Sequence, residues 1–189
     1  MEQPPDAIDV PARHVVLAGM MGCGKSTVGR ILAARLGRPL RDSDTEIGAR
    51  EGRTVREIRD DLGTAAMHDV EARVLQDALA RPGPDVICAA ASIADDDGCL
   101  AALATPEVAV VWLRVRPGTA AARFPSGTHR PWYGADPAVF LARQAASRGP
   151  RLAAVATLTL DADERTPDEL ADAILAGLAG GPDRQPRRP

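Results

Sequence analysis

The sequence predicts a three-layer αβα sandwich, an α/β fold built on a five-stranded parallel sheet. A glycine-rich motif over 19–27 lies between a short apolar run and a helical pattern, and four more apolar runs alternate with helices further along the chain. The 189 residues, 45% of them hydrophobic, suffice for one compact domain. We expect this domain to span 13–178, with a flexible segment over 1–12 and a disordered tail over 179–189.

The first strand and helix enclose the glycine-rich motif. Val15–Ala18 is an apolar run typical of a buried parallel strand, and apolar residues recur at helical spacing from Lys25 to Leu36. Gly37 and Pro39 then predict the end of this helix. The motif between them, G-M-M-G-C-G-K-S-T, matches the phosphate loop G-x-x-x-x-G-K-[ST] in its expected strand–loop–helix setting.

The motif predicts a nucleotide site. Gly22 and Gly24 allow backbone N–H groups to turn inward, where the helix N-terminus also favours an anion. Lys25 adds a charge for the β/γ-phosphates, Ser26 offers a hydroxyl to Mg²⁺, and Thr27 is expected near the α-phosphate. The alternative is a glycine-rich turn that only joins strand to helix.

Two carboxylates follow the next strand. Leu40 and Arg41 predict the end of a short second strand, which brings Asp42 and Asp44 to the carboxyl edge of the sheet. Ligands bind at this edge in open α/β sheets, so both are candidate site residues. The alternative is that Asp42 and Asp44 are turn and helix-cap residues.

The remaining elements are predicted by their periodicity and caps. A capping box at Thr54 opens a short helix toward Asp61, Gly63 breaks the chain, and a longer helix follows over Met67–Ala78. Further strands are expected at 86–89, 108–113 and 155–160, and helices at 95–103, 117–123, 137–147 and 167–178, with Arg148-Gly149-Pro150 interrupting or bending the third of these helices. Between them, Phe124–Asp136 contains two prolines and two glycines, which predicts an exposed, mobile lid.

Composition excludes several functions. A net charge of −3 and only two Trp, two Phe and one Tyr argue against nucleic-acid binding. No signal segment or membrane-spanning run is visible, so we expect a cytoplasmic protein with reduced cysteines. We also expect a monomer or a weak dimer. Cys23 lies inside the phosphate loop, where a small side chain fits and a redox role is the less favoured alternative.

Over about residues 14–178, this order of features resembles the shikimate kinase family. The resemblance implies an ATP-dependent kinase that uses Mg²⁺ and transfers the γ-phosphoryl group to a hydroxyl of a small metabolite. It implies that Asp42 supports Mg²⁺ through water and that Asp44 holds or deprotonates the acceptor hydroxyl. Arg130, followed by Pro131, matches the lid arginine that closes over the phosphates.

The resemblance also assigns three other arginines. Arg123 and Arg165 match residues beside the nucleotide base, and Arg148 matches the R-x-P arginine that holds the acceptor carboxylate. The alternative is that Arg123, Arg130 and Arg148 are solvated surface charges.

The acceptor region departs from the family pattern. His68 replaces a second carboxylate-binding arginine, Glu71 is kept, and the family's triple glycine is Ala89–Ala91, which predicts that Ala90 and Ala91 crowd the pocket. Losing one arginine–carboxylate contact removes about 1.5–3 kcal/mol, or about 10- to 150-fold in affinity. We therefore predict an acceptor other than shikimate: a hydroxylated amino acid, an aminocyclitol or a related hydroxy acid. The alternatives are a true shikimate kinase with a divergent site and an inactive nucleotide-binding homologue.

Overall fold

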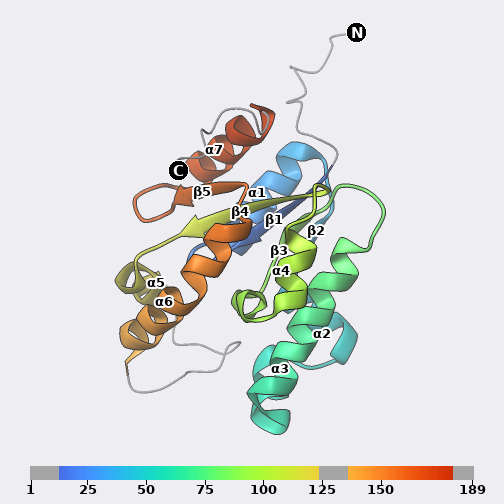
Figure 1. Ribbon diagram of the computed structural model, residues 1–189, viewed down its shortest axis with the longest axis vertical. Coiled ribbons are helices and arrows are strands. Elements are labelled where there is room, and N and C mark those ends of the chain that lie inside the picture. The colour runs from blue at the N-terminus through green and yellow to red at the C-terminus, as the bar shows by residue number, and fades with distance from the viewer. Residues whose placement is uncertain (1–12, 124–135, 181–189) are drawn as a thin grey trace.

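The computed structural model describes residues 13–123 and 136–180 and confirms the parallel five-stranded sheet (Figure 1). Neighbouring strands are parallel in the order β2-β3-β1-β4-β5. All five carboxyl ends therefore lie at one edge of the sheet. The strands are β1 His14–Ala18, β2 Leu40–Asp42, β3 Val86–Cys88, β4 Val108–Arg114 and β5 Leu158–Asp161.

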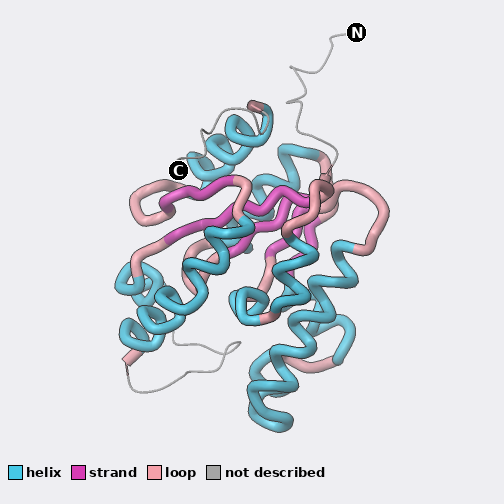
Figure 2. The backbone as a smooth tube through the Cα atoms, viewed as in Figure 1, coloured by secondary structure: helices cyan, strands magenta, loops and turns pink. Residues whose placement is uncertain are grey.

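Helices cover both faces of the sheet, which confirms the three-layer prediction (Figure 2). They are α1 Lys25–Leu36, α2 Ser43–Glu51, α3 Val55–Leu79, α4 Asp97–Leu103, α5 Pro117–Arg123, α6 Pro137–Val155 and α7 Pro167–Ala179, with a 3₁₀ turn, η1, at Ala91–Asp95. Among the described helices, none is long and apolar enough to cross a membrane. Most of the predicted lid, 124–135, and the chain ends, 1–12 and 181–189, lie outside the described residues.

Alternating strand residues divide the core into two layers. Leu17 and Val111 face α1 and α7, where they belong to a buried cluster with Leu32 and Ile174. Val16 and Val110 point to the opposite face and join a second cluster that includes residues of α3, α4 and α6. The sheet is therefore buried on both faces, as the nearly continuous apolar runs predict.

The break at Gly63 is confirmed. Gly63 has φ 89° and ψ 169°, so the helical path of α3 is interrupted there although the segment continues to Leu79. Positive φ is strained for a residue with a β-carbon, which explains glycine at this point. The second part of α3 carries His68 and Glu71, so this break sets the direction in which both residues approach the sheet.

Three predicted boundaries were wrong. The helix expected to stop at Ser147 runs on to Val155, because Arg148 and Leu152 are buried on the inner side while Pro150 is exposed. The last strand consequently begins at Leu158 rather than 155. The helix expected from residue 95 begins at Asp97, capped by the Asp96 carboxylate.

Candidate functional site

The phosphate loop joins β1 to α1 and holds Lys25 close to its own backbone. Lys25 Nζ donates hydrogen bonds to the carbonyl oxygens of Gly19 and Met20, at 2.8 Å and 3.0 Å. Gly22 has φ 77°, and a β-carbon there would lie 2.4 Å from the carbonyl oxygen of Ala120 in α5. Glycine is therefore required at position 22 both by the backbone conformation and by the close approach of α5. Gly24, with φ 96°, caps the helix that begins at Lys25.

The cysteines near the loop are free thiols in packed surroundings. Cys23 is buried, and its Sγ lies 3.7 Å from Lys25 Nζ. Cys88, at the end of β3, donates to the Lys25 carbonyl oxygen at 3.3 Å, and burial raises the pKa of its thiol to about 12. Cys88 therefore stays a neutral thiol that supports the first turn of α1.

Ser26 and Asp42 meet at the edge of the loop. Ser26 Oγ donates to Asp42 Oδ2 at 2.6 Å, and Asp42 Oδ1 accepts from the Asp44 backbone N–H at 3.2 Å. Asp42 is thus the N-cap of α2, as the cap interpretation predicted, and it also reaches the phosphate loop. Asp44 lies half-buried in the first turn of α2, and Thr27 is exposed in the first turn of α1. A hydroxyl and a carboxylate are oxygen ligands that suit Mg²⁺, which binds few protein groups and keeps waters and phosphate oxygens.

Arg123 approaches the loop that follows β5. Its guanidinium donates from Nη1 to the Ala162 carbonyl at 2.8 Å and from Nη2 to the Asp163 carbonyl at 2.6 Å. Arg165 is exposed in the same loop, before α7. The two arginines predicted beside the base are thereby brought to one region, whereas Arg130 lies outside the described residues.

A cavity of about 190 Å³ lies between the phosphate loop, α3, η1 and α6. Four predicted acceptor residues line it together: His68, Glu71, Ala91 and Arg148. The other two predicted acceptor residues, Asp44 and Ala90, do not line this cavity. Ala90 is buried and lines a smaller cavity with Ala89, Ile87 and Ser43, whereas Ala91, the first residue of η1, lines the acceptor cavity. The other lining residues, which were not among the predicted site residues, are Met21, Val55, Thr64, Met67, Ser92, Phe140 and Gln144.

The alanines that replace the family's glycines are not strained. Ala90 has φ −62°, and among the described residues only glycines have positive φ. Alanine therefore changes the shape of this turn only through its methyl groups.

Glu71 places a carboxylate in the acceptor cavity. Its side chain is buried on the inner face of α3, and its Oε2 accepts a hydrogen bond from Ser92 Oγ in η1. His68, one turn earlier on α3, is half-buried in the same wall. His68 thus stands where the family pattern has a carboxylate-binding arginine, one turn from the carboxylate of Glu71, which the family pattern shares.

Arg148 is buried and already engaged by two side chains. Its Nε and Nη2 both donate to Asp95 Oδ2, at 2.9 Å and 2.5 Å, and its Nη1 donates to Gln144 Oε1 at 2.8 Å. It is therefore not a solvated surface charge. Gln144 is four residues away on α6, a spacing visible in the sequence, but Asp95 comes from η1 and gives no local signal.

Comparison with known proteins identifies the family. The family profile described as shikimate kinase matches residues 21–179. This chain belongs to the shikimate kinase family. A shikimate kinase of Thermobifida fusca is 38% identical over 168 residues, covering 89% of this chain and 96% of the relative. One from Caulobacter vibrioides is 37% identical over 175 residues, covering 92% of this chain and 86% of the relative.

A solved structure agrees with this assignment. The shikimate kinase from Acinetobacter baumannii in complex with shikimate matches with a TM-score of 0.81 at 29% identity, covering 86% of this chain and 90% of that one. Shikimate kinases are ATP-dependent small-molecule kinases with a hydroxyl acceptor, and they use ATP and Mg²⁺. The predicted enzyme class and cofactors are therefore confirmed.

Proposed function

We propose that this shikimate kinase family member transfers the γ-phosphoryl group of ATP to a hydroxyl of a small metabolite bound between Glu71 and Arg148. One observation carries the proposal: Met21, inside the phosphate loop, also lines the acceptor cavity. An acceptor in that cavity therefore lies beside the loop that would hold the terminal phosphate. Such proximity is the main requirement of phosphoryl transfer, which depends on positioning and charge neutralisation.

Several residues would neutralise the negative charge of the transferring phosphoryl group. The Lys25 ammonium group, which is hydrogen-bonded to the carbonyl oxygens of Gly19 and Met20, would contact the β/γ-phosphate oxygens when ATP binds, as the motif predicts. Ser26 and Asp42 would hold Mg²⁺, which when bound draws charge from the same oxygens. Asp44 orients the acceptor hydroxyl or accepts its proton, and Arg130 closes over the phosphates with the lid and excludes water.

The charges around the acceptor cavity favour an acceptor with an amino group. Glu71 contributes a buried carboxylate, and the positive charge of Arg148 is balanced by Asp95. His68 does not supply the permanent charge of an arginine. Among the described residues, these groups leave no excess of positive charge for a carboxylate. We therefore propose a hydroxylated amino acid or an aminocyclitol as the acceptor.

Shikimate itself is the second candidate. The relatives from Thermobifida fusca and Caulobacter vibrioides carry the name shikimate kinase, and their names favour shikimate over any other acceptor. Arg148 and Glu71 are both retained for it. The carboxylate of shikimate would have to compete with Asp95 for the guanidinium of Arg148. Shikimate would also lack the second arginine contact, because His68 stands at that position.

An ATP-consumption assay with a matched panel of acceptors tests the proposal. The panel contains L-homoserine, an inosamine, shikimate and uncharged myo-inositol, each with Mg²⁺·ATP. We expect turnover, with a phosphorylated product seen by mass spectrometry, for an amine-bearing acceptor at least tenfold above shikimate. Higher turnover of shikimate would establish the second candidate, turnover of myo-inositol alone would exclude the amine, and ATP binding without any product would exclude catalysis.

The proposal includes a cytoplasmic enzyme that is a monomer or weak dimer. The three cysteines are free thiols, as in a reducing compartment. Sedimentation at micromolar concentration tests the oligomeric state, and a tight dimer would contradict it.

A further inference from the structure

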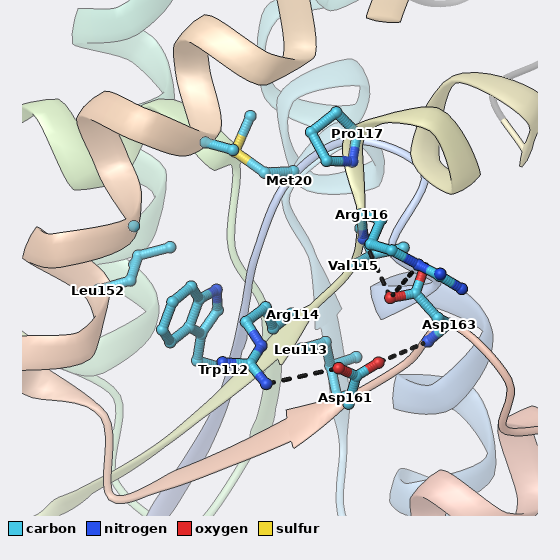
Figure 3. Close-up of a pocket in the computed structure, with 12 residues that line it drawn as sticks. Met20, Trp112, Leu113, Arg114, Val115, Arg116, Pro117, Leu152, Asp161 and Asp163 are labelled. Carbon is cyan, nitrogen blue, oxygen red and sulfur yellow. Dashed lines mark hydrogen bonds and ion pairs between the residues drawn. The ribbon is translucent and has the colours of Figure 1, made fainter.

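A second cavity, of about 410 Å³, lies between α6 and the carboxyl end of β4 (Figure 3). Met20 of the phosphate loop borders it, and Leu152 of α6 and Trp112 of β4 form further parts of its wall. It shares no lining residue with the acceptor cavity. Its volume lies in the range of small-molecule sites, about 300–1,000 Å³.

Small residues on α6 keep this space open above an aromatic ring. Ala145 and Gly149, four apart on one face of α6, both line the cavity. A β-carbon placed on Gly149 would stand 3.8 Å from Cη2 of Trp112. Glycine at this position therefore leaves the edge of the indole beneath α6 uncovered by a side chain.

Trp112 presents both an apolar face and a polar atom to the cavity. It is half-buried, whereas the β4 residues on either side of it are buried. In Figure 3 the nitrogen-bearing edge of the indole faces Met20 and Arg114 rather than Leu152. Within 13–123 and 136–180, no group accepts a hydrogen bond from this indole N–H. An indole N–H inside an apolar site is a donor for a ligand atom.

The charged rim is internally balanced. Arg114 Nη2 lies 3.4 Å from Asp161 Oδ2, and Arg116 Nε lies 3.3 Å from Asp163 Oδ2. The formal charges of these four rim residues therefore cancel, so the rim offers a charged ligand no net attraction, and a neutral ligand leaves both pairs in place.

We propose that this cavity is a second ligand site, which takes a neutral, planar aromatic compound that stacks against Trp112 and accepts a hydrogen bond from its indole N–H. The cavity lies next to the phosphate loop. Met20 lines the cavity with its side chain while its carbonyl holds Lys25. Because the Met20 carbonyl and side chain serve the two sites separately, we expect nucleotide and aromatic ligand to bind at the same time.

Quinoline is the probe, because it is bicyclic, neutral at pH 8 and has a single acceptor atom. The two tryptophans of the chain, 112 and 132, are assigned in the ¹⁵N spectrum with the Trp132→Phe variant. We expect the Trp112 indole N–H signal to shift saturably with quinoline, with a dissociation constant on the order of 0.1–1 mM for about ten heavy atoms. The same shift is expected with ADP·Mg²⁺ at saturation.

Variants separate this site from adventitious binding. Ala145→Leu fills the cavity and weakens quinoline binding at least tenfold, while Ala146→Leu, exposed on the same helix, changes it less than twofold. Trp112→Phe keeps an aromatic ring but removes the donor, so saturation-transfer NMR should report binding weaker by about tenfold. Loss of binding with ADP, an unchanged affinity in Ala145→Leu, or tighter binding of quinoline-4-carboxylate would each overturn the proposal.

Discussion

The nucleotide half and the acceptor half of this kinase are held together in different ways. At the phosphate loop, backbone atoms define the site: Lys25 is held by two loop carbonyls, and Gly22 is required by the carbonyl of Ala120. The acceptor cavity is instead defined by side chains from the phosphate loop, α3, η1 and α6, and Arg148 is oriented by Asp95 from η1. A backbone-defined site tolerates few changes, whereas a side-chain-defined site can change its ligand by single substitutions.

The largest expected effect is at Lys25. Lys25→Met should lower kcat by about 10²- to 10³-fold, because a positioned donor to the transferring phosphoryl group is lost. Steady-state kinetics give the value, and circular dichroism checks the fold. A kcat within tenfold of the parent would contradict the assigned role.

Lys25 is also the only lysine in the chain, which allows a direct control. Reductive methylation can modify only Lys25 and the terminal amine. Mg²⁺·ATP should protect Lys25 alone, as measured by peptide mass spectrometry. Equal modification with and without nucleotide would place the phosphates elsewhere.

The contact between Ser26 and Asp42 predicts the next largest effect. Ser26→Ala or Asp42→Asn should raise the Mg²⁺ concentration for half-maximal rate by about tenfold, because one oxygen ligand or its support is lost. A titration of rate against Mg²⁺ measures this, with Ser147→Ala on the exposed side of α6 as the matched control. An unchanged titration in both variants would leave Asp42 as a helix cap only.

Asp95 tests the acceptor half. Asp95→Asn frees Arg148 for an acceptor carboxylate, so the ratio of kcat/KM for shikimate to that for an amine acceptor should rise about tenfold. Asp97→Asn is the control, because Asp97 pairs with Arg151 outside the cavity. If both variants leave the ratio unchanged, Asp95 does not compete for Arg148.

The smallest effect concerns acid stability in the nucleotide half. Hydrogen bonds from Thr119 and from the Arg116 backbone lower the pKa of Asp163 from 3.8 to about 2. Because the pKa of Asp163 is lower in the folded than in the unfolded protein, the ionised carboxylate stabilises the fold at pH values above the unfolded-state pKa. This stabilisation is lost as the pH falls through the folded-state pKa, here between about pH 4 and pH 2. The difference in unfolding free energy between the parent and Asp163→Asn, from urea titrations, should be constant above pH 5 and shrink below pH 4. A difference independent of pH would exclude this contribution.

The same contrast explains what the sequence could predict. The phosphate loop is contiguous, so one motif with its flanking strand and helix predicts the site and five parallel strands follow from the alternation. The Asp95–Arg148 pair joins residues 53 positions apart, and the pattern contains no sign of it. Likewise, burial of Arg148 and Leu152 carries α6 past Pro150, a tertiary effect that overrides the local helix-breaking signal.

His68 gives the most direct test of the central claim, that the nucleotide half follows the family while the acceptor half has changed its charge preference. Calorimetric titration of shikimate and of Mg²⁺·ATP into the parent and His68→Arg compares both halves in one experiment. The account predicts that His68→Arg binds shikimate about 10- to 150-fold more tightly, with ATP affinity unchanged within twofold. Equal shikimate affinity in the two proteins would contradict it.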